Sequence, residues 1–477
     1  MDLRAAMLEH ELESIVGPEN VVTEPSEMIA QMADVWWMTR FLLSTGVEFP
    51  RPFAIVFPAD RHEVIKLVQF ANEHKVAIVP RGGGAGDSGG SLPLMGGIVV
   101  DMKRMDRILE VNEQSLTVRV QPGILHKHLE EQLNRLGYTT NHLPASLNTS
   151  TLGGFISTNG TGVLSSKYGK MSDLVHQLEV VLPNGHLFKS LPVRLHSTGP
   201  DYSRLFLGAE GTLGIITEVL MKIYPLPEKR AFATFLLPRL GEGIEAGRRI
   251  MVSGLAPSLL RLYDERDTHK ILKGQFGLDQ EGCCLLLGFD GLERMVDVSL
   301  SLAADIVLAA GATDLGPNLA QNWWDNRYRS YYPPNDYIYH PWMTAVMDTV
   351  APYERIEAVY WAMKFAVEDG FRDWNAEFHA HFSHWYDWGT SFYPSFVIKE
   401  YPADPRQAFR LYNQVLDRAL DASLQGGGVI NEHHGVGLRI GRLMKEAYGE
   451  GYELARALKR VLDPNNIMNP GKLGLGE

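Results

Sequence analysis

Residues 80–90 read PRGGGAGDSGG, with six glycines in eleven positions, directly after the apolar run VAIV. Glycine clusters persist where the backbone needs positive φ or where a large group approaches it closely, because glycine otherwise costs folding entropy. Successive N–H groups in such a turn form a nest for anions, most often phosphates. The stretch lacks the GK[ST] ending of a triphosphate loop and the acidic ribose partner of a Rossmann fingerprint. Alone, it leaves a linker, a tight turn and a cofactor cradle open.

Two further stretches are rich in glycine and hydroxyl groups. They are ASLNTSTLGGFISTNGTG at residues 145–162 and FLGAEGTLGIITEV at residues 206–219. Each supplies backbone N–H groups and Ser or Thr donors with little bulk, as an extended dinucleotide held by main chain at three places requires. The alternative is three unrelated turns. We interpret the three stretches together as one cofactor site.

Composition excludes several classes of protein. The chain has 477 residues, 45% of them hydrophobic, and a formal net charge of -12 without any basic block. Nucleic acid and anionic membrane surfaces are therefore not expected partners. The acidic start MDLRAAMLEHELESIVG differs from a secretory signal, and no apolar run approaches the roughly 18 residues of a membrane span. We expect a cytoplasmic protein without an integral membrane segment, in which Cys283 and Cys284 are buried neighbours in a strand rather than a disulfide.

Three regions of the chain differ in their sequence patterns. From residue 53 to residue 225, short β-rich runs alternate with helical stretches such as HEVIKLVQFANEHK, which indicates an α+β or α/β domain. From residue 231 to about residue 420, longer helices alternate with strands, and we interpret this region as a substrate-facing domain. The last part, from residue 426, returns to glycines and histidines and ends in a helix stopped by DP. We expect it to fold back on the first domain.

Six motifs in order resemble one family: PRGGGAGDSGG, STLGGFISTNGTG, YGKMSDLVHQLEVVLPNG, LFLGAEGTLGIITE, INEHHGVG and LDPNNIMNPGK. Together they are similar to the flavin oxidoreductases of the vanillyl-alcohol oxidase and p-cresol methylhydroxylase type. The resemblance implies an α+β fold, with a PCMH-type FAD-binding domain of two subdomains and a cap domain with an antiparallel sheet and flanking helices. The expected divisions are an N-terminal helical segment over 1–48, the FAD-binding domain over 49–227, the cap over 228–422 and a returning segment over 423–477.

The same resemblance implies that FAD is the cofactor. Many members attach the flavin to a histidine at the first glycine loop, but Ala85, Gly86 and Asp87 stand there, so we expect noncovalent FAD; His142 is the nearest histidine in the second stretch. The expected FAD-binding residues are Pro80, Arg81, Gly82, Gly83, Gly84, Ala85, Gly86, Asp87, Ser88, Ser146, Leu147, Thr149, Ser150, Thr151, Gly153, Gly154, Thr158, Asn159, Gly160, Thr161, Glu210, Gly211, Thr212, Gly214, Ile215, Ile216 and Asn469.

For activity, the first alternative is a D-2-hydroxy acid dehydrogenase type, which resembles the chain at NEHHGVG. In that type a histidine takes the hydroxyl proton while hydride leaves for flavin N5, which suits the pKa of imidazole. Its second metal-ligand motif is replaced by SHWYDWGTSFYPSF, with Phe392 or Tyr393 where a histidine should stand, so we expect no metal. The expected catalytic residues are His433, His434, Tyr393, Arg261, Glu432 and His384. The substrate is a small molecule, and the electron acceptor is oxygen, a quinone or an electron-transfer protein.

Two other enzyme activities compete with it. Alkyldihydroxyacetonephosphate synthase, a flavoenzyme without net redox change, is similar at STGPDYSRLFLGAEGTLG, PSLLRLYDE, DTVAPYERI and HFSHWYDWGTSFY, but YIYHPWMTAVM lacks an arginine for the phosphate. The phenolic alcohol oxidases are suggested by the aromatic stretch 323–342, with Tyr328, Tyr331, Tyr332, Tyr337 and Tyr339, although such rings also fill cores. A flavoprotein without catalysis is the class set against all three. We favour the oxidoreductase acting on a hydroxyl-bearing carbon, with a homodimer formed through the cap.

Strand periodicity gives two further expectations. His379 and His381 should share one face of a strand and His384 should point away from it, which disfavours a three-histidine metal site. The side chain of Tyr393 should point to the face of the strand opposite to that of Phe392 and to the same face as Ser395.

Overall fold

The computed structural model describes residues 3–47, 49–277, 279–329 and 342–476. The first sheet is built where the sequence alternates short β-rich runs with a helix. Its order is β1 (Val21–Val22), β2 (Ala54–Val56), β4 (Ile98–Asp101), β3 (Ile78–Arg81), with β2, β4 and β3 parallel. Helices α1 (Leu3–Val16) and α4 (Arg61–His74) cover it. The Asp60 side chain accepts from His62 N and Glu63 N and so caps α4 at its start.

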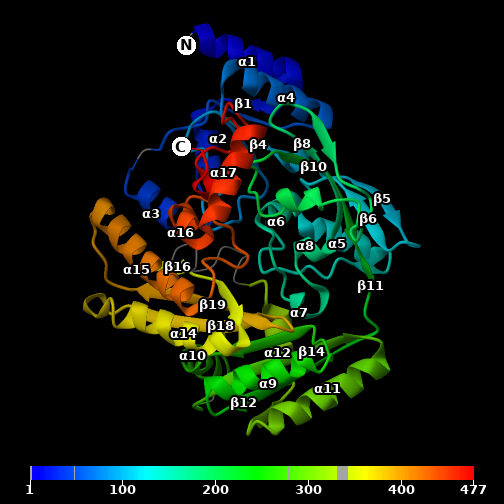
Figure 1. Ribbon diagram of the computed structural model, residues 1–477, viewed down its shortest axis with the longest axis vertical. Helices are drawn as coiled ribbons and strands as arrows, with labels where there is room; N and C mark the ends of the chain where they lie inside the picture. Colours follow the sequence, from blue (N-terminus) through cyan, green and yellow to red (C-terminus); the bar gives the residue numbers. More distant parts are fainter. Residues whose placement is uncertain (1–2, 48, 278, 330–341, 477) are drawn as a thin grey trace.

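The second sheet is antiparallel and completes the FAD-binding region. Its order is β5 (Ile108–Asn112), β6 (Thr117–Val120), β10 (Ile215–Lys222), β8 (Val175–Val181), β9 (Leu187–Lys189). A separate pair joins β7 (Tyr138–Thr139) to β11 (Tyr224–Pro225). Beside the sheet lie α5 (His126–Arg135), α6 (Leu152–Thr158) and α8 (Met171–Leu174) (Figure 1). The short helix α7 (Ser165–Tyr168) lies against the sheet of the cap. The first glycine loop follows β3, the second leads into α6, and the third leads into β10, so all three lie at element ends.

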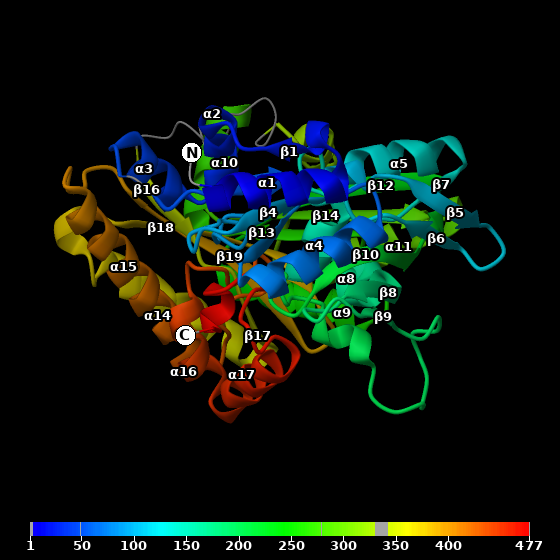
Figure 2. The same ribbon diagram turned by 90° about the horizontal axis from the view of Figure 1, so that it is seen from above.

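The cap forms the opposite end of the molecule from α1 and α4 (Figure 1). Its antiparallel sheet has the order β15 (Thr313–Gly316), β12 (Lys229–Leu237), β14 (Cys283–Gly291), β13 (Leu259–Tyr263), β18 (Glu377–Trp385), β19 (Gly389–Ile398), β16 (Met343–Val346), and β17 (Thr349–Pro352) also pairs with β19. Its helices are α9 (Leu240–Val252), α10 (Glu265–Phe276), α11 (Glu293–Leu308), α12 (Asn318–Asn326), α14 (Tyr353–Glu368) and α15 (Pro405–Gly426). Helices α14 and α15 pack side by side (Figure 2).

Both faces of the cap sheet are covered, which explains the long apolar run in β14. Cys283 and Leu285 belong to one core, and Cys284 and Leu286 to another that includes Trp324 of α12. Neighbouring strand residues point to opposite faces, so each cysteine enters a different core. The prediction of two buried, unpaired strand cysteines is confirmed.

A β-bulge in β18 changes which histidines face the same way. His381 pairs with Tyr393 and Phe382 with Phe392, but His384 pairs with Ser391, so one extra residue is inserted after Phe382. The insertion shifts the alternation by one, and His381 and His384 both line the same cavity. The expectation that His384 points away from the face of His381 is therefore wrong.

The chain returns to the first domain after α15. A short 3-10 turn (Gly441–Leu443), α16 (Met444–Tyr448) and α17 (Glu450–Leu462) follow, and α17 ends directly before the predicted stop at Asp463. Met468 then forms a parallel bridge with Ile78 of β3, and Asn469 N donates to Ile78 O at 2.7 Å. The numbered domain divisions of the sequence analysis stay predictions. None of the helices in the described ranges is both long and apolar enough to cross a membrane.

The cap core gives a test of these assignments. Phe396 of β19 is fully buried and packs on Tyr412 of α15, whereas Phe409 of α15 is 41% exposed. We predict that Phe396→Ala lowers the free energy of unfolding by about 3–5 kcal/mol, because it leaves a cavity. Phe409→Ala, the same chemical change at the surface, should cost less than about 1 kcal/mol. Urea titrations of both variants check this, and equal losses would contradict the assigned core.

Candidate functional site

One cavity of about 500 Å³ brings the three glycine-rich stretches together. Its walls include Pro80, Arg81, Gly82, Gly83, Gly84, Ala85, Gly86, Asp87 and Ser88 from the first stretch, Ser146, Ser150, Thr151, Gly153, Gly154, Thr158, Gly160 and Thr161 from the second, and Glu210, Gly211, Gly214, Ile215 and Ile216 from the third. At the cap end it is lined by Arg261, His381, Ser383, His384, Tyr393, His433 and His434. Segments that are far apart in the sequence therefore share one cavity.

Five residues expected in the FAD site lie outside the cavity wall, and each has a different role in the described structure. Leu147 is part of a hydrophobic core, and Asn159 ends α6 with φ 50°. The carbonyl of Thr149 faces Gly83, and the Thr212 hydroxyl donates to Ala209 O at 2.7 Å. The Asn469 side-chain amide donates to Gly90 O at 2.8 Å and Glu210 O at 2.6 Å. These side chains shape the wall from behind.

Bare backbone is required in the first glycine loop. A Cβ on Gly82 would lie 2.1 Å from Thr151 Oγ1, and a Cβ on Gly83 would lie 1.8 Å from Thr149 O. Such distances are impossible for real atoms, so the loop must be glycine to pack on the second stretch. A Cβ on Gly86 would meet nothing within 4 Å, because this part of the loop faces the cavity.

The polar groups of the wall fit an FAD molecule. The Thr161 hydroxyl is buried at the cavity without a hydrogen-bond partner among the described residues, as is Oδ1 of Asp87. Buried polar groups normally have partners, so these atoms mark a place for a polar ligand. No histidine of the described lining comes from the glycine stretches. His142 is 1% exposed, packs its ring on Phe155 at 4.9 Å between centroids, and lies outside the lining.

The N-terminal segment closes part of the same cavity, which was not expected from the sequence. Asp34 and Val35 line it. Asp34 Oδ2 accepts from Gly89 N at 2.8 Å, Val35 N donates to Gly86 O at 2.8 Å, and Arg81 donates to Ala33 O at 2.8 Å. Burial raises the pKa of Asp34 to about 6 against the opposing effect of the hydrogen bonds from Trp36 N and Gly89 N and of the Arg81 charge. The only feature of the sequence that could have indicated this contact is the single acid, Asp34, in the apolar run ADVWW.

Arg261 brings a cation to the cap end of the cavity. Its Nε donates to the Tyr263 hydroxyl at 2.7 Å, and its Nη2 lies 2.7 Å from Nε2 of His381. The His381 ring stacks on Tyr393 with 4.8 Å between centroids. Burial, reinforced by Arg261, lowers the pKa of His381 well below its ordinary value, so this imidazole is neutral and accepts from the guanidinium. As expected, Tyr393 faces the cavity while its neighbour Phe392 is in the core.

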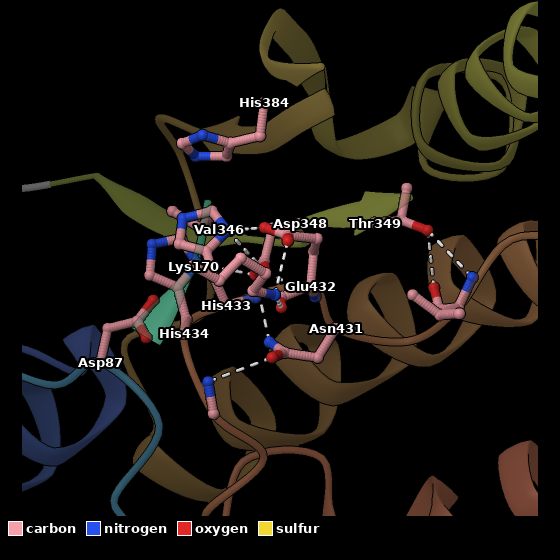
Figure 3. Close-up of polar contacts among 12 residues, drawn as sticks. Asp87, Lys170, Val346, Asp348, Thr349, His384, Asn431, Glu432, His433 and His434 are labelled. Carbon is pink, nitrogen blue, oxygen red and sulfur yellow. Dashed lines mark hydrogen bonds and ion pairs between the residues drawn. The ribbon is translucent and has the colours of Figure 1, made fainter. Parts of the chain in front are cut away.

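A buried carboxylate holds the loop that carries the paired histidines (Figure 3). Asp348 lies between β16 and β17, and its Oδ2 accepts from Glu432 N and His433 N at 2.7 Å each. Its Oδ1 accepts from the Asn431 amide at 3.1 Å and lies 2.7 Å from Nδ1 of His434. Burial alone would raise the pKa of Asp348, but His434 and His433 lower it well below its ordinary value. Asp348 was not predicted as a site residue, although a lone acid in the apolar run MTAVMDTVA requires buried partners.

Glu432 supports the other histidine from behind the cavity wall. Its Oε2 lies 2.6 Å from Nδ1 of His433, and its Oε1 accepts from Lys170 Nζ at 2.6 Å and the Tyr386 hydroxyl at 2.7 Å. His384, also in the wall, has its Nδ1 2.8 Å from the Ser165 hydroxyl. Both histidines of the pair thus have Nδ1 engaged with a carboxylate. The ligand atoms of His384, Glu432 and His433 lie within 4.8 Å of one another, as do those of Asp348, His433 and His434, close enough to share a metal ion.

Comparison with known proteins agrees with this geometry. A family model of the FAD binding domain matches residues 52–190, and a model of the C-terminal domain of FAD linked oxidases matches residues 226–473. The alkyldihydroxyacetonephosphate synthase of Trypanosoma brucei brucei is 30% identical over 470 residues, which are 92% of this chain and 75% of that protein. The mitochondrial D-lactate dehydrogenase (cytochrome) of Arabidopsis thaliana is 29% identical over 431 residues, 88% of this chain and 73% of that protein.

Solved structures share the fold. A structure of alkyldihydroxyacetonephosphate synthase superimposes with a TM-score of 0.81 at 27% identity and covers 98% of this chain and 84% of that chain. A structure of p-cresol methylhydroxylase gives a TM-score of 0.79 at 17% identity, covers 100% of this chain and 98% of that chain, and supports the fold alone. The expected fold of PCMH type is confirmed.

The glycine loop gives a test of the FAD site. We predict that Gly83→Ala lowers the flavin content of the purified protein by at least about tenfold, because the new Cβ has no space beside Thr149 O. Gly274→Ala, where a Cβ meets nothing within 4 Å, should leave the flavin content unchanged. The flavin released by acid precipitation measures both, and it should equal the total flavin if attachment is noncovalent. Flavin that stays with the precipitate would contradict noncovalent binding.

Proposed function

Because the chain belongs to the family of FAD-linked oxidases, we propose that it is an FAD-dependent oxidoreductase that oxidises the hydroxyl-bearing carbon of a small 2-hydroxy acid. One observation carries the proposal: a guanidinium, Arg261, and two histidines with Nδ1 bound to carboxylates line the same end of the FAD cavity. A 2-hydroxy acid presents a carboxylate and a neighbouring hydroxyl. It therefore needs one cation and one base side by side.

The three glycine-rich stretches would hold FAD, with the first loop at the pyrophosphate and Asp34 closing the cavity beside it. When bound, the flavin supplies the acceptor for the hydride. The protein residues then have two tasks, to orient the substrate and to remove its hydroxyl proton. Arg261 is the cation of the cap end among the described lining residues, and Tyr393 bounds the substrate space next to it.

His434 is the base that we propose. Its Nδ1–H donates to Asp348, which fixes the tautomer and leaves Nε2 to accept the substrate proton. Burial alone would lower the pKa of His434, but Asp348 and Asp87 raise it above its ordinary value. A more basic imidazole takes a proton more readily, provided that it starts neutral. His433, held by Glu432 in the same way, is its neighbour in the wall and orients the hydroxyl.

A synthase activity is the second candidate. It is favoured by the 30% identity to an alkyldihydroxyacetonephosphate synthase over most of both chains. Against it, a dianionic phosphate is usually bound by several cations, and the described lining contains only Arg261 and Arg81, of which Arg81 is bound to the N-terminal segment.

The phenolic activity has less support from the described residues. The rings of the cavity wall are Phe155 and Tyr393 besides the histidines, while Trp324 and Tyr328 are in a hydrophobic core. Tyr331, Tyr332, Tyr337 and Tyr339 of the aromatic stretch lie outside the described residues.

Anaerobic mixing of the holoenzyme with substrates tests the proposal. D-lactate, glycolate or D-2-hydroxyglutarate should bleach the flavin. We predict that His434→Gln slows this reduction by about 10²–10⁴-fold, because the proton acceptor is lost. His379→Gln should not change it, since His379 is bound to Asp267 outside the cavity. Reduction only by a p-hydroxybenzyl alcohol, or a spectral change only with an acylated dihydroxyacetone phosphate, would contradict the proposal in favour of the respective alternative.

The substrate cation can be tested in the same assay. Arg261→Gln should raise the KM for hydroxy acids by at least about tenfold, since a charge-assisted contact to the carboxylate is lost. The rate of reduction at saturation should change less. An unchanged KM would contradict the role of Arg261.

The pH dependence of flavin reduction tests the base. His434 must be neutral to act, so the rate should fall as the pH drops through its pKa. Burial and Arg439 lower this pKa, but Asp348 and Asp87 outweigh them and raise it above its ordinary value. Asp348→Asn removes one of these negative charges, so we predict that the acid limb of the pH profile moves to lower pH. Asn431→Ala, which removes a hydrogen bond to Asp348 without changing charge, should leave the limb in place. An acid limb at the same pH in Asp348→Asn as in wild type would contradict the assignment of His434 as the base.

A further inference from the structure

Glu432 lies where three parts of the chain meet. Lys170 caps the start of α8 in the FAD-binding region, Tyr386 follows β18 of the cap, and Glu432 itself belongs to the returning C-terminal loop. The Lys170 ammonium donates to Oε1 of Glu432 and to the Glu432 carbonyl, at 2.6 Å each. The side chain of Glu432 is 2% exposed and that of Lys170 is 16% exposed, so both charges are largely removed from water.

The same carboxylate belongs to a set of side chains with the chemistry of a metal site. One carboxylate and two imidazoles, from Glu432, His384 and His433, have ligand atoms within 4.8 Å of one another. Such a donor set suits a divalent transition metal. In this chain, however, both carboxylate oxygens are already used: Oε1 by Lys170 and Tyr386, and Oε2 by His433. A divalent ion bound there would have a buried ammonium within a few Å, and like charges repel strongly where water is excluded.

We propose that Lys170 is the resident cation of this site and takes the place of a divalent metal ion. Its ammonium neutralises Glu432 and fixes the carboxylate, which in turn holds Nδ1 of His433 and leaves the other ring nitrogen toward the cavity. Lys170 is thus a positioning residue, since it acts through Glu432 and does not line the cavity. The inference deepens the proposed function, because it rests on His433 as part of the proton-handling pair.

Lys167 is a matched control. It lies three residues before Lys170 and also pairs with a buried carboxylate, Asp290, at 2.9 Å, but in the cap away from the histidines. Removing the Lys170 ammonium leaves the buried carboxylate of Glu432 without an ammonium partner, a state that costs folding energy and attracts another cation. Removing the Lys167 ammonium leaves Asp290 paired with Arg230, whose Nη2 lies 3.1 Å from Asp290 Oδ2. Of these two carboxylates, Glu432 has two imidazoles beside it and Asp290 belongs to no such group among the described residues, so the loss of Lys170 should create a transition-metal site and the loss of Lys167 should not.

The experiment compares wild-type holoenzyme with Lys170→Met, Lys170→Arg and Lys167→Met. Each protein is treated with EDTA, dialysed against Zn²⁺ or Mn²⁺ in separate samples, and analysed for bound metal and for the rate of flavin reduction. We expect wild type and Lys167→Met to bind no stoichiometric metal and to keep their rate after EDTA. Lys170→Met should bind one equivalent of Zn²⁺ with an affinity at least about tenfold higher than that of wild type. Its kcat should be at least about tenfold lower than that of wild type, with little change in KM. Lys170→Arg should resemble wild type.

Two results would overturn the inference. The first is a stoichiometric metal ion in wild type whose removal by EDTA abolishes flavin reduction. The second is a folded Lys170→Met variant whose affinity for Zn²⁺ and Mn²⁺ and whose kcat equal those of wild type. If Lys170→Met does not fold, Lys170→Gln takes its place with the same expected results. Metal binding is measured without substrate, so a failure to find any reducing substrate would count against the proposed function and leave this test intact.

Discussion

The Asp348 carboxylate is the contact on which the arrangement of the reactive end depends. It is fully buried between two cap strands and binds four consecutive residues, 431–434, of the loop that follows α15. A buried charge is stable only when its hydrogen-bonding groups have partners, and the partners of the Asp348 carboxylate are groups of this loop. The position of both histidines is therefore a consequence of satisfying one acid. Arg439, bound to Asp87 and to Val346 O, ties the same loop to the glycine cradle.

The site lies at a junction of three regions of the chain. The FAD-binding region gives bare backbone and small hydroxyl groups, the cap gives a cation, a tyrosine and two imidazoles, and the C-terminal loop gives the two imidazoles whose Nδ1 atoms contact carboxylates. Relatives named for a synthase and for a dehydrogenase share this framework, as expected where function depends on a few side chains placed on a common fold. The difference between such activities is therefore to be sought in the cation and the histidines of the cap end, and not in the cradle.

Much of this could be read from the sequence, and the exceptions have physical reasons. We predicted the glycine stretches, Arg261, Tyr393, His433 and His434, because glycine clusters and the order of motifs can be recognised in short stretches of sequence. Asp348, Lys170 and Asp34 were missed, because each is an ordinary charged residue whose partner is at least 55 residues away. The face of His384 was predicted wrongly because periodicity assumes an unbroken strand, and one inserted residue in β18 reverses the face of every residue after Phe382.

The bridge between Met468 and Ile78 bears on how the protein is made. The first glycine loop begins two residues after Ile78, yet the strand before it obtains its last neighbour only from the end of the chain. Glu210 in the third stretch likewise accepts from Val436 N and Gly437 N. While the polypeptide is still on the ribosome, with its final segment inside the exit tunnel, Ile78 lacks this partner. We therefore expect the strand before the cradle to be completed only after translation, and a chain cut short before Met468 to contain every glycine of the cradle without that strand neighbour.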